Sequence, residues 1–115
     1  MSEPIYKIAR VHEWEEAVGT GIFNGSPDDK RDGFIHFSTA AQVRATCDKY
    51  FAEEERFYLV AVDPDGLGPA LKWEPSRGGQ LFPHLYGILP LALVLSVTEI
   101  GRGPDGNFAF SAEIA

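Results

Sequence analysis

Cysteine is almost absent from this sequence of 115 residues. Cys47 is the single thiol, so no internal disulfide can form and no cysteine-based metal site can be built. Long apolar runs are missing as well: no segment approaches the length that spans a bilayer, and residues 1–14 contain no apolar core of a signal peptide. These absences lead us to expect a cytoplasmic protein that does not associate with membranes.

Positive charge is also scarce. The sequence has 10 basic and 17 acidic residues, which gives a formal net charge of −7. Proteins that bind nucleic acids usually present a basic surface that neutralises phosphates, whereas the basic residues here are scattered. We therefore expect no nucleic-acid partner. A small phosphate-bearing ligand remains compatible with this composition, because one arginine and a few backbone N–H groups are enough to hold it.

The apolar content of 44% is sufficient for one folded domain covering residues 1–115. Apolar and β-branched segments predict strands, and helical spacing predicts two helices. Glycine, proline, asparagine and aspartate predict loops over residues 19–33 and 75–90. The predicted strands are 5–11, 34–38, 57–63, 70–74, 91–100 and 108–111, and the predicted helices are 12–18 and 39–51. We expect an α+β domain in which the helices pack on a small, curved antiparallel or mixed sheet.

The sequence predicts more about the helix at 39–51 and the strand at 57–63. Thr39 has the spacing of a capping box with Gln42, which predicts Thr39 as the N-cap of the second helix. The helix would then place one apolar stripe toward the core, formed by Val43, Cys47, Tyr50 and Phe51. The strand at 57–63 is almost entirely apolar, which predicts a central position in its sheet.

The stretch DGFIHFSTAAQ places a histidine inside an apolar strand. Alternation along a strand puts Ile35 and Phe37 on one face, and His36 and Ser38 on the other. The predicted helix start that follows offers free N–H groups to an anion or polar ligand. His36 is therefore either a site residue, together with Ser38 and Thr39, or a core histidine bonded to a backbone carbonyl.

Two later segments contain further candidates. In FPHLYG, an extended backbone points His84 and Tyr86 to the same face, where they form either one wall of a cleft or the polar edge of a shaped loop. In WEPSRGG, Glu74 and Arg77 precede two glycines that would let a phosphate approach, although the pattern is looser than a P-loop and also fits an exposed hairpin tip. Trp73 is either a stacking platform or part of the core.

Metal and serine-nucleophile chemistry find no support in the sequence. The three histidines, His12, His36 and His84, are widely spaced and match no zinc pattern, so we predict no metal ligands. His12 lies at a predicted helix start and is interpreted as a solvated polar residue. Ser38 lacks the glycine-flanked context of a serine nucleophile.

Four segments together, IYKI, DGFIHFSTAAQ, LKWEPSRGG and FPHLYGILP, resemble a small bacterial family, domain of unknown function 952. The resemblance extends from Ile5 to about Val97. It implies membership in the ADP-ribosyltransferase-like fold group, whose enzymes cleave NAD between nicotinamide and ribose. It also implies that His36 lies near the nicotinamide, that Lys7 replaces a histidine common in the family, and that His84 replaces the catalytic glutamate of the group.

The resemblance thus implies a small nucleotide ligand, NAD as a substrate, and an NAD-cleaving or ADP-ribosyl-transferring enzyme with His36 and His84 as catalytic residues. The expected ligand-binding residues are Ser38, Thr39, Trp73, Glu74, Arg77 and Tyr86. A neutral imidazole cannot supply the negative charge that a glutamate offers to the transition state, so Glu74 is a candidate replacement. Two alternatives stay open: a noncatalytic module that binds a metabolite or a protein through the same cleft, and a scaffold without a small-molecule site.

Overall fold

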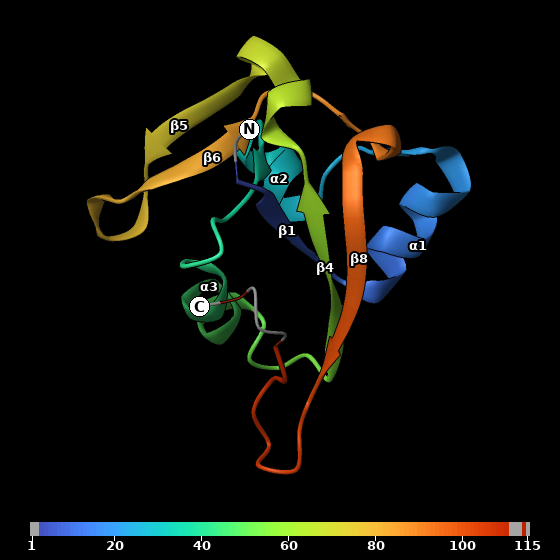
Figure 1. Ribbon diagram of the computed structural model, residues 1–115, viewed down its shortest axis with the longest axis vertical. Helices are drawn as coiled ribbons and strands as arrows, with labels where there is room; N and C mark the ends of the chain where they lie inside the picture. Colours follow the sequence, from blue (N-terminus) through green and yellow to red (C-terminus); the bar gives the residue numbers. More distant parts are fainter. Residues whose placement is uncertain (1–2, 111–113, 115) are drawn as a thin grey trace.

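The computed structural model describes residues 3–110 and 114, apart from the side chain of Arg77. Within these residues the chain forms short strands, three α-helices and three short 3-10 turns (Figure 1). The strands are β1 (Ile5–Ala9), β2 (Ile22–Phe23), β3 (Ile35–His36), β4 (Arg56–Val62), β5 (Leu71–Pro75), β6 (Leu81–Leu85), β7 (Leu89–Pro90) and β8 (Val94–Gly101). The helices are α1 (Val11–Thr20), α2 (Pro27–Asp32) and α3 (Val43–Tyr50), and the 3-10 turns are Pro64–Ala70, Arg77–Gly79 and Leu91–Leu93.

The strands form three antiparallel sheets. The largest has the order β1-β4-β8, the second has the order β3-β6-β5, and β2 pairs with β7. The central position of β4, expected from its apolar sequence, is confirmed. An isolated bridge between Tyr6 and Ser38 connects β1 to the segment that follows β3, so the first two sheets meet at this point.

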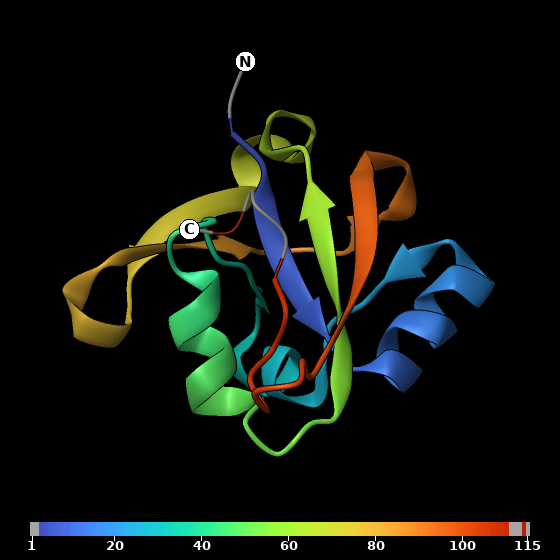
Figure 2. The same ribbon diagram turned by 60° about the horizontal axis from the view of Figure 1, so that its bottom comes forward.

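The core lies on both faces of the β1-β4-β8 sheet. Alternation along β1 sends Ile5 and Ala9 to a cluster that includes Trp14 of α1, and sends Tyr6 and Ile8 to a cluster that includes residues of α3. Figure 2 shows the two helices on opposite sides of this sheet. Burial on both faces explains why β4 is apolar along most of its length.

The segment 19–33 is not the loop that the sequence predicts. It contains β2 and the short helix α2, which begins after Ser26 with a complete capping box. The Ser26 hydroxyl accepts a hydrogen bond from Asp29 N at 3.2 Å, and Asp29 Oδ2 accepts one from Ser26 N at 2.8 Å. Pro27 occupies the first helical position, and Gly33 ends the helix with a φ of +88°. Turn-forming residues therefore specify a helix here.

The segment 75–90 also contains regular structure instead of a continuous loop. β6 pairs with β5 on one side and with β3 on the other, and β7 follows it. Pro83 lies within β6 and cannot donate a ladder hydrogen bond, but its carbonyl accepts one from Phe37 N at 3.0 Å. Pro83, one of the residues that predicted a loop, thus lies inside a strand.

Two further predictions need correction. Helix α3 begins at Val43, so Thr39 is not its N-cap; the Gln42 side chain still reaches back to accept a hydrogen bond from Thr39 N at 3.0 Å. Val43, Cys47 and Phe51 are buried as predicted, but the side chain of Tyr50 is 54% exposed.

At the C-terminal end, the predicted strand 108–111 is not formed by its described residues. Phe108 makes only an isolated bridge to Arg102, and residue 111 lies outside the described part of the chain. In residues 3–110, no helix has the length and apolar character needed to cross a membrane.

The capping geometry reverses the order of two substitutions, because the sequence predicts Thr39 as an N-cap and places Ser26 in a loop. We expect Ser26→Ala to lower the free energy of unfolding by about 1 kcal/mol, because it removes the side-chain acceptor of a helix cap. Thr39→Ala should change it by less than about 0.5 kcal/mol, since Thr39 caps no helix. Urea denaturation of both variants measures the difference, and equal losses would contradict this description of the two helix starts.

Candidate functional site

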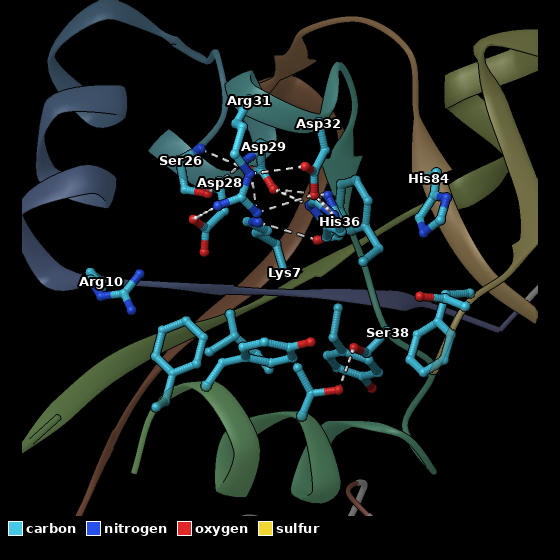
Figure 3. Close-up of a pocket in the computed structure, with 18 residues that line it drawn as sticks. Lys7, Arg10, Ser26, Asp28, Asp29, Arg31, Asp32, His36, Ser38 and His84 are labelled. Atoms are coloured by element: carbon cyan, nitrogen blue, oxygen red, sulfur yellow. Dashed lines mark hydrogen bonds and ion pairs between the residues drawn. The ribbon is translucent and has the colours of Figure 1, made fainter. Parts of the chain in front are cut away.

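A cavity of about 240 Å³ lies between β1, α2, β3, α3 and β6. Figure 3 shows Arg10 at one end of the view and His84 at the other, with Asp32, His36 and Lys7 between them. The wall of the cavity combines aromatic, acidic and basic side chains. This mixture of apolar surface and convergent polar groups is typical of a ligand site.

The polar part of the wall is organised around the carboxylate of Asp29. This residue is only 2% exposed, yet its two oxygens accept four hydrogen bonds. Oδ2 accepts from Lys7 Nζ and Ser26 N, each at 2.8 Å, and Oδ1 accepts from His36 N at 3.1 Å and His36 Nδ1 at 2.6 Å. Burial by itself raises the pKa of Asp29, but the bond from His36 and the charge of Lys7 outweigh it and hold that pKa well below the ordinary range.

Lys7 is the buried cation of this arrangement. Its Nζ lies 2.8 Å from Asp29 Oδ2 and also donates to the backbone carbonyl of His36 at 3.2 Å. The side chain is only 6% exposed, so this lysine is an internal partner of Asp29. It holds the strand that carries His36 against β1.

His36 is held by carboxylates at both ring nitrogens. Nδ1 lies 2.6 Å from Asp29 Oδ1, and Nε2 lies 3.0 Å from Asp32 Oδ2. Because ionised carboxylates only accept hydrogen bonds, this geometry is satisfied by a ring that carries hydrogen on both nitrogens. The hydrogen bond from Arg31 lowers the pKa of Asp32, which favours its ionised form.

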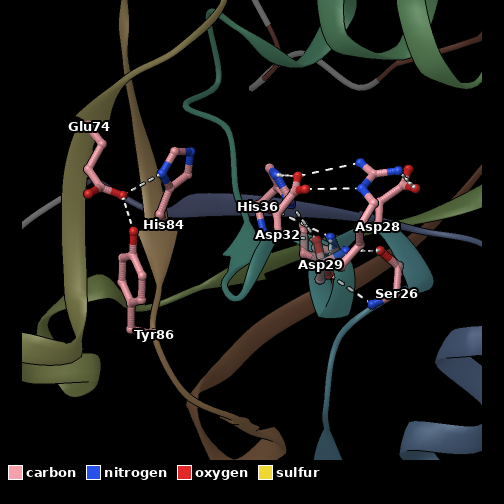
Figure 4. Close-up of polar contacts among 10 residues, drawn as sticks. Ser26, Asp28, Asp29, Asp32, His36, Glu74, His84 and Tyr86 are labelled. Atoms are coloured by element: carbon pink, nitrogen blue, oxygen red, sulfur yellow. Dashed lines mark hydrogen bonds and ion pairs between the residues drawn. The ribbon is translucent and has the colours of Figure 1, made fainter.

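His84 is held differently. It lies directly opposite His36 in the β3–β6 pair, with 5.6 Å between the two ring centroids. Its Nδ1 lies 2.8 Å from Glu74 Oε1, and the same oxygen accepts a 2.7 Å hydrogen bond from the Tyr86 hydroxyl (Figure 4). The bonds from Tyr86 and His84 lower the pKa of Glu74, and the bond to Glu74 raises the pKa of Tyr86.

Only one ring nitrogen of His84 is therefore engaged within the described chain. With Nδ1–H donating to Glu74, the neutral tautomer of the ring offers Nε2 as a hydrogen-bond acceptor. The His84 side chain lines the cavity and is 6% exposed. Phe34 stacks on the ring at a centroid distance of 4.0 Å and fixes its plane. A buried acceptor next to a cavity is satisfied by water or by a ligand.

The structure brings together some of the sequence candidates. His36, Ser38 and His84 line the same cavity, and Ile35 and Phe37 are buried in the core, as the alternation predicts. The prediction that His84 and Tyr86 point to one face is confirmed by their shared contact with Glu74.

Other candidates lie elsewhere. Thr39 and Trp73 line a separate depression with Pro64 and Leu71, so the structure does not place them beside His36. Trp73 is 46% exposed and is not part of the core. The backbone of Arg77 belongs to a 3-10 turn, and its side chain lies outside the described part of the structure.

Asp29 and Asp32 are the site residues that sequence reasoning missed. Both belong to α2, which was predicted as part of a loop. The spacing of Ser26 and Asp29, with Pro27 between them, is the capping-box signal that could have placed a helix beside His36. That signal would still not have shown that the same carboxylate also binds Lys7.

Metal and thiol chemistry gain no support from the described residues. Within residues 3–110 no group of three or more His, Cys, Asp and Glu side chains is arranged to hold a metal ion. Cys47 of α3 is buried in the core, and this burial raises its pKa to about 12, so the thiol is not a nucleophile at neutral pH.

Comparison with known proteins places the chain in a family. A family model described as a protein of unknown function, DUF952, matches residues 8–97, and the chain belongs to this family. None of the curated proteins matches the sequence. The family and the α+β fold expected from the sequence are thereby confirmed, while the relation to ADP-ribosyltransferases stays a prediction.

Solved structures of protein CC0527 from Caulobacter crescentus are similar over most of their length. The X-ray structure is 42% identical, with a TM-score of 0.86, and the match covers 92% of this chain and 93% of that one. The solution NMR structure of CC0527 is 43% identical, with a TM-score of 0.79 and coverage of 90% and 89%.

The buried ion pair with Lys7 makes Asp29 far more important to stability than the neighbouring Asp28. We expect Asp29→Asn to lower the free energy of unfolding by about 3 kcal/mol, because it leaves the buried Lys7 ammonium without a counter-charge. The adjacent Asp28→Asn, at an exposed position, should cost less than about 0.5 kcal/mol. Urea denaturation at neutral pH compares the two.

The pH dependence of the free energy of unfolding tests the same role of Asp29 a second time. Because the pKa of Asp29 is lower in the folded than in the unfolded protein, its contribution is present above about pH 4 and is lost as the pH falls further. Wild-type stability should therefore fall more steeply below about pH 4 than that of Asp29→Asn. Parallel curves for the two proteins would contradict this role of Asp29.

Proposed function

We propose that the cavity beside His36 and His84 binds a small nucleotide and that His84 moves a proton on it. The observation that carries the proposal is the Glu74–His84 contact, in which a carboxylate holds Nδ1 and leaves Nε2 available to the cavity. The same arrangement orients the general base of many hydrolytic enzymes. NAD is the first ligand to test, because the resemblance to ADP-ribosyltransferases implies it.

The size and lining of the cavity favour one nucleoside-sized portion of such a ligand. Its volume of about 240 Å³ lies just below the roughly 300–1,000 Å³ of typical small-molecule sites. The rings of Tyr6, Phe51 and Phe82 line it and offer apolar surface to a base or a nicotinamide. Arg10 and Arg31, which also line it, are the basic groups available to a phosphate.

The chemistry proposed for NAD breaks the bond between the nicotinamide nitrogen and the ribose C1′. A water or acceptor oxygen forms the new bond to C1′ and loses its proton to Nε2 of His84, and nicotinamide leaves with the bonding electron pair. Glu74 stabilises the imidazolium that forms on His84. Glu74 thus acts through His84 rather than on the ribose, where the glutamate of ADP-ribosyltransferases acts.

A second candidate function is a noncatalytic module that binds a metabolite through the same cavity. The observation that favours it is the position of His36, whose two nitrogens are both occupied by carboxylates of the protein. Such a ring can contribute charge to binding but has no free nitrogen with which to accept a proton. In this reading a nucleotide binds and leaves unchanged.

The variant that separates the two functions is His84→Asn. The asparagine amide can still donate to Glu74 but offers no basic nitrogen to the cavity. If the protein cleaves NAD, we expect nicotinamide release to fall at least about 100-fold, the size of a general-base effect, while binding of ADP-ribose changes little. Chromatography measures nicotinamide release, and an NMR titration measures binding.

His12→Asn is the matched control, because His12 lies on α1, is highly exposed and does not line the cavity. It should leave both measurements unchanged. Binding without turnover in the wild type would support the noncatalytic module. Absence of any chemical-shift change with millimolar NAD, ADP-ribose and AMP would contradict a nucleotide site altogether.

A further inference from the structure

The carboxylate of Asp32 is held at the cavity wall by two cationic groups. Oδ2 lies 3.0 Å from His36 Nε2 and 3.5 Å from Arg31 Nη2, and Oδ1 lies 3.1 Å from Arg31 Nε. A guanidinium that contacts both oxygens, together with an imidazolium on one of them, is a usual way to bind an external phosphate or carboxylate. Asp32 therefore fills the position that such an anion would take.

The geometry points to a phosphate subsite that Asp32 occupies in the absence of ligand: the phosphate group of the ligand displaces the Asp32 carboxylate from His36 Nε2 and from Arg31. This inference rests on the proposed function in so far as it takes the ligand to be a nucleotide. The existence of the phosphate subsite can be tested separately, by the binding of inorganic phosphate.

Asp32 is suited to leave this position, whereas Asp29 is not. The Asp32 side chain is 34% exposed, and in the described part of the chain its carboxylate bonds only Arg31 and His36. It is the last residue of α2, and Gly33 follows it. Exposed ion pairs of this kind contribute little to stability, so their exchange for a ligand costs little. Asp29 is buried and holds four hydrogen bonds.

The surrounding charges favour the exchange. With Asp32 in place, the three cationic groups Lys7, protonated His36 and Arg31 are balanced by the three carboxylates of Asp28, Asp29 and Asp32. Asp28 Oδ1 lies 3.1 Å from Arg31 Nη1. Once Asp32 moves away, this part of the cavity has an excess of positive charge, which suits a phosphate.

His84 supplies a second and independent indication of a ligand. It is 5% exposed, its Nε2 has no partner in the described chain, and its ring lies 5.6 Å from that of His36. A nucleotide whose phosphate replaces Asp32 would bring its sugar toward this unpaired acceptor. The hydroxyl groups of a ribose are donors of the kind that Nε2 lacks.

The test compares Asp32→Asn with Asp28→Asn. Both substitutions remove one negative charge from α2 and an ion pair with Arg31, but only the first removes the competitor for His36. Calorimetric titration with inorganic phosphate should show about fivefold tighter binding to Asp32→Asn than to Asp28→Asn, the size of an exposed ion-pair contact. Equal binding to the two variants, weaker binding to Asp32→Asn, or no binding to either overturns the inference.

Wild-type protein gives a readout that needs no variant. Phosphate should shift the ¹⁵N resonance of His36 Nε2 as it replaces Asp32, and a resonance that does not move at saturating phosphate overturns the inference. Acetate serves as the carboxylate comparison. A larger response to acetate than to phosphate would assign the subsite to a carboxylate ligand instead.

A comparison of AMP with adenosine, which lacks the phosphate, separates this inference from the proposed function. If AMP binds the wild type more tightly than adenosine does, both stand. If AMP and adenosine bind equally, the nucleotide site stands and the phosphate subsite fails. If neither binds while inorganic phosphate still prefers Asp32→Asn, the subsite stands and the nucleotide function fails.

Discussion

The buried carboxylate of Asp29 is the interaction on which the candidate site depends. It caps α2 through Ser26, neutralises Lys7 of β1, and orients the backbone and ring of His36. The elements β1, α2 and β3 thus share one acceptor, although Lys7 and Asp29 are 22 residues apart in the sequence. A carboxylate with so many donors stays ionised although it is buried, since each bond stabilises its charged form. The stability of this part of the fold and the geometry of the site therefore have the same physical origin.

The two histidines face each other across the β3–β6 pair but are prepared for different roles. His36 has a carboxylate at each ring nitrogen, a geometry that suits a cation, whereas His84 has one carboxylate partner and an Nε2 without a partner in the described chain. Neighbouring titratable groups whose environments differ in this way are typical of sites that combine binding with proton transfer. This contrast is the reason to assign charge recognition to His36 and proton transfer to His84.

Local patterns predicted part of this arrangement, and long-range contacts determined the rest. Alternation placed His36 and Ile35 on different faces of the strand, and two-residue spacing placed His84 and Tyr86 on the same face. Both predictions succeed because they depend only on neighbouring residues. The pairing of His36 with His84 depends on register between strands far apart in the chain. The contact between Lys7 and Asp29 could not be predicted either, because no local signal joins positions 22 residues apart.

The protonation of the two imidazoles tests the account most directly. A two-bond ¹H–¹⁵N spectrum of the histidine side chains at neutral pH resolves which ring nitrogens carry hydrogen. We expect hydrogen on both nitrogens of His36, and on Nδ1 but not on Nε2 of His84. A neutral His36, or a His84 that carries hydrogen on Nε2, would contradict the assignment of a fixed cation and a free base to this cavity.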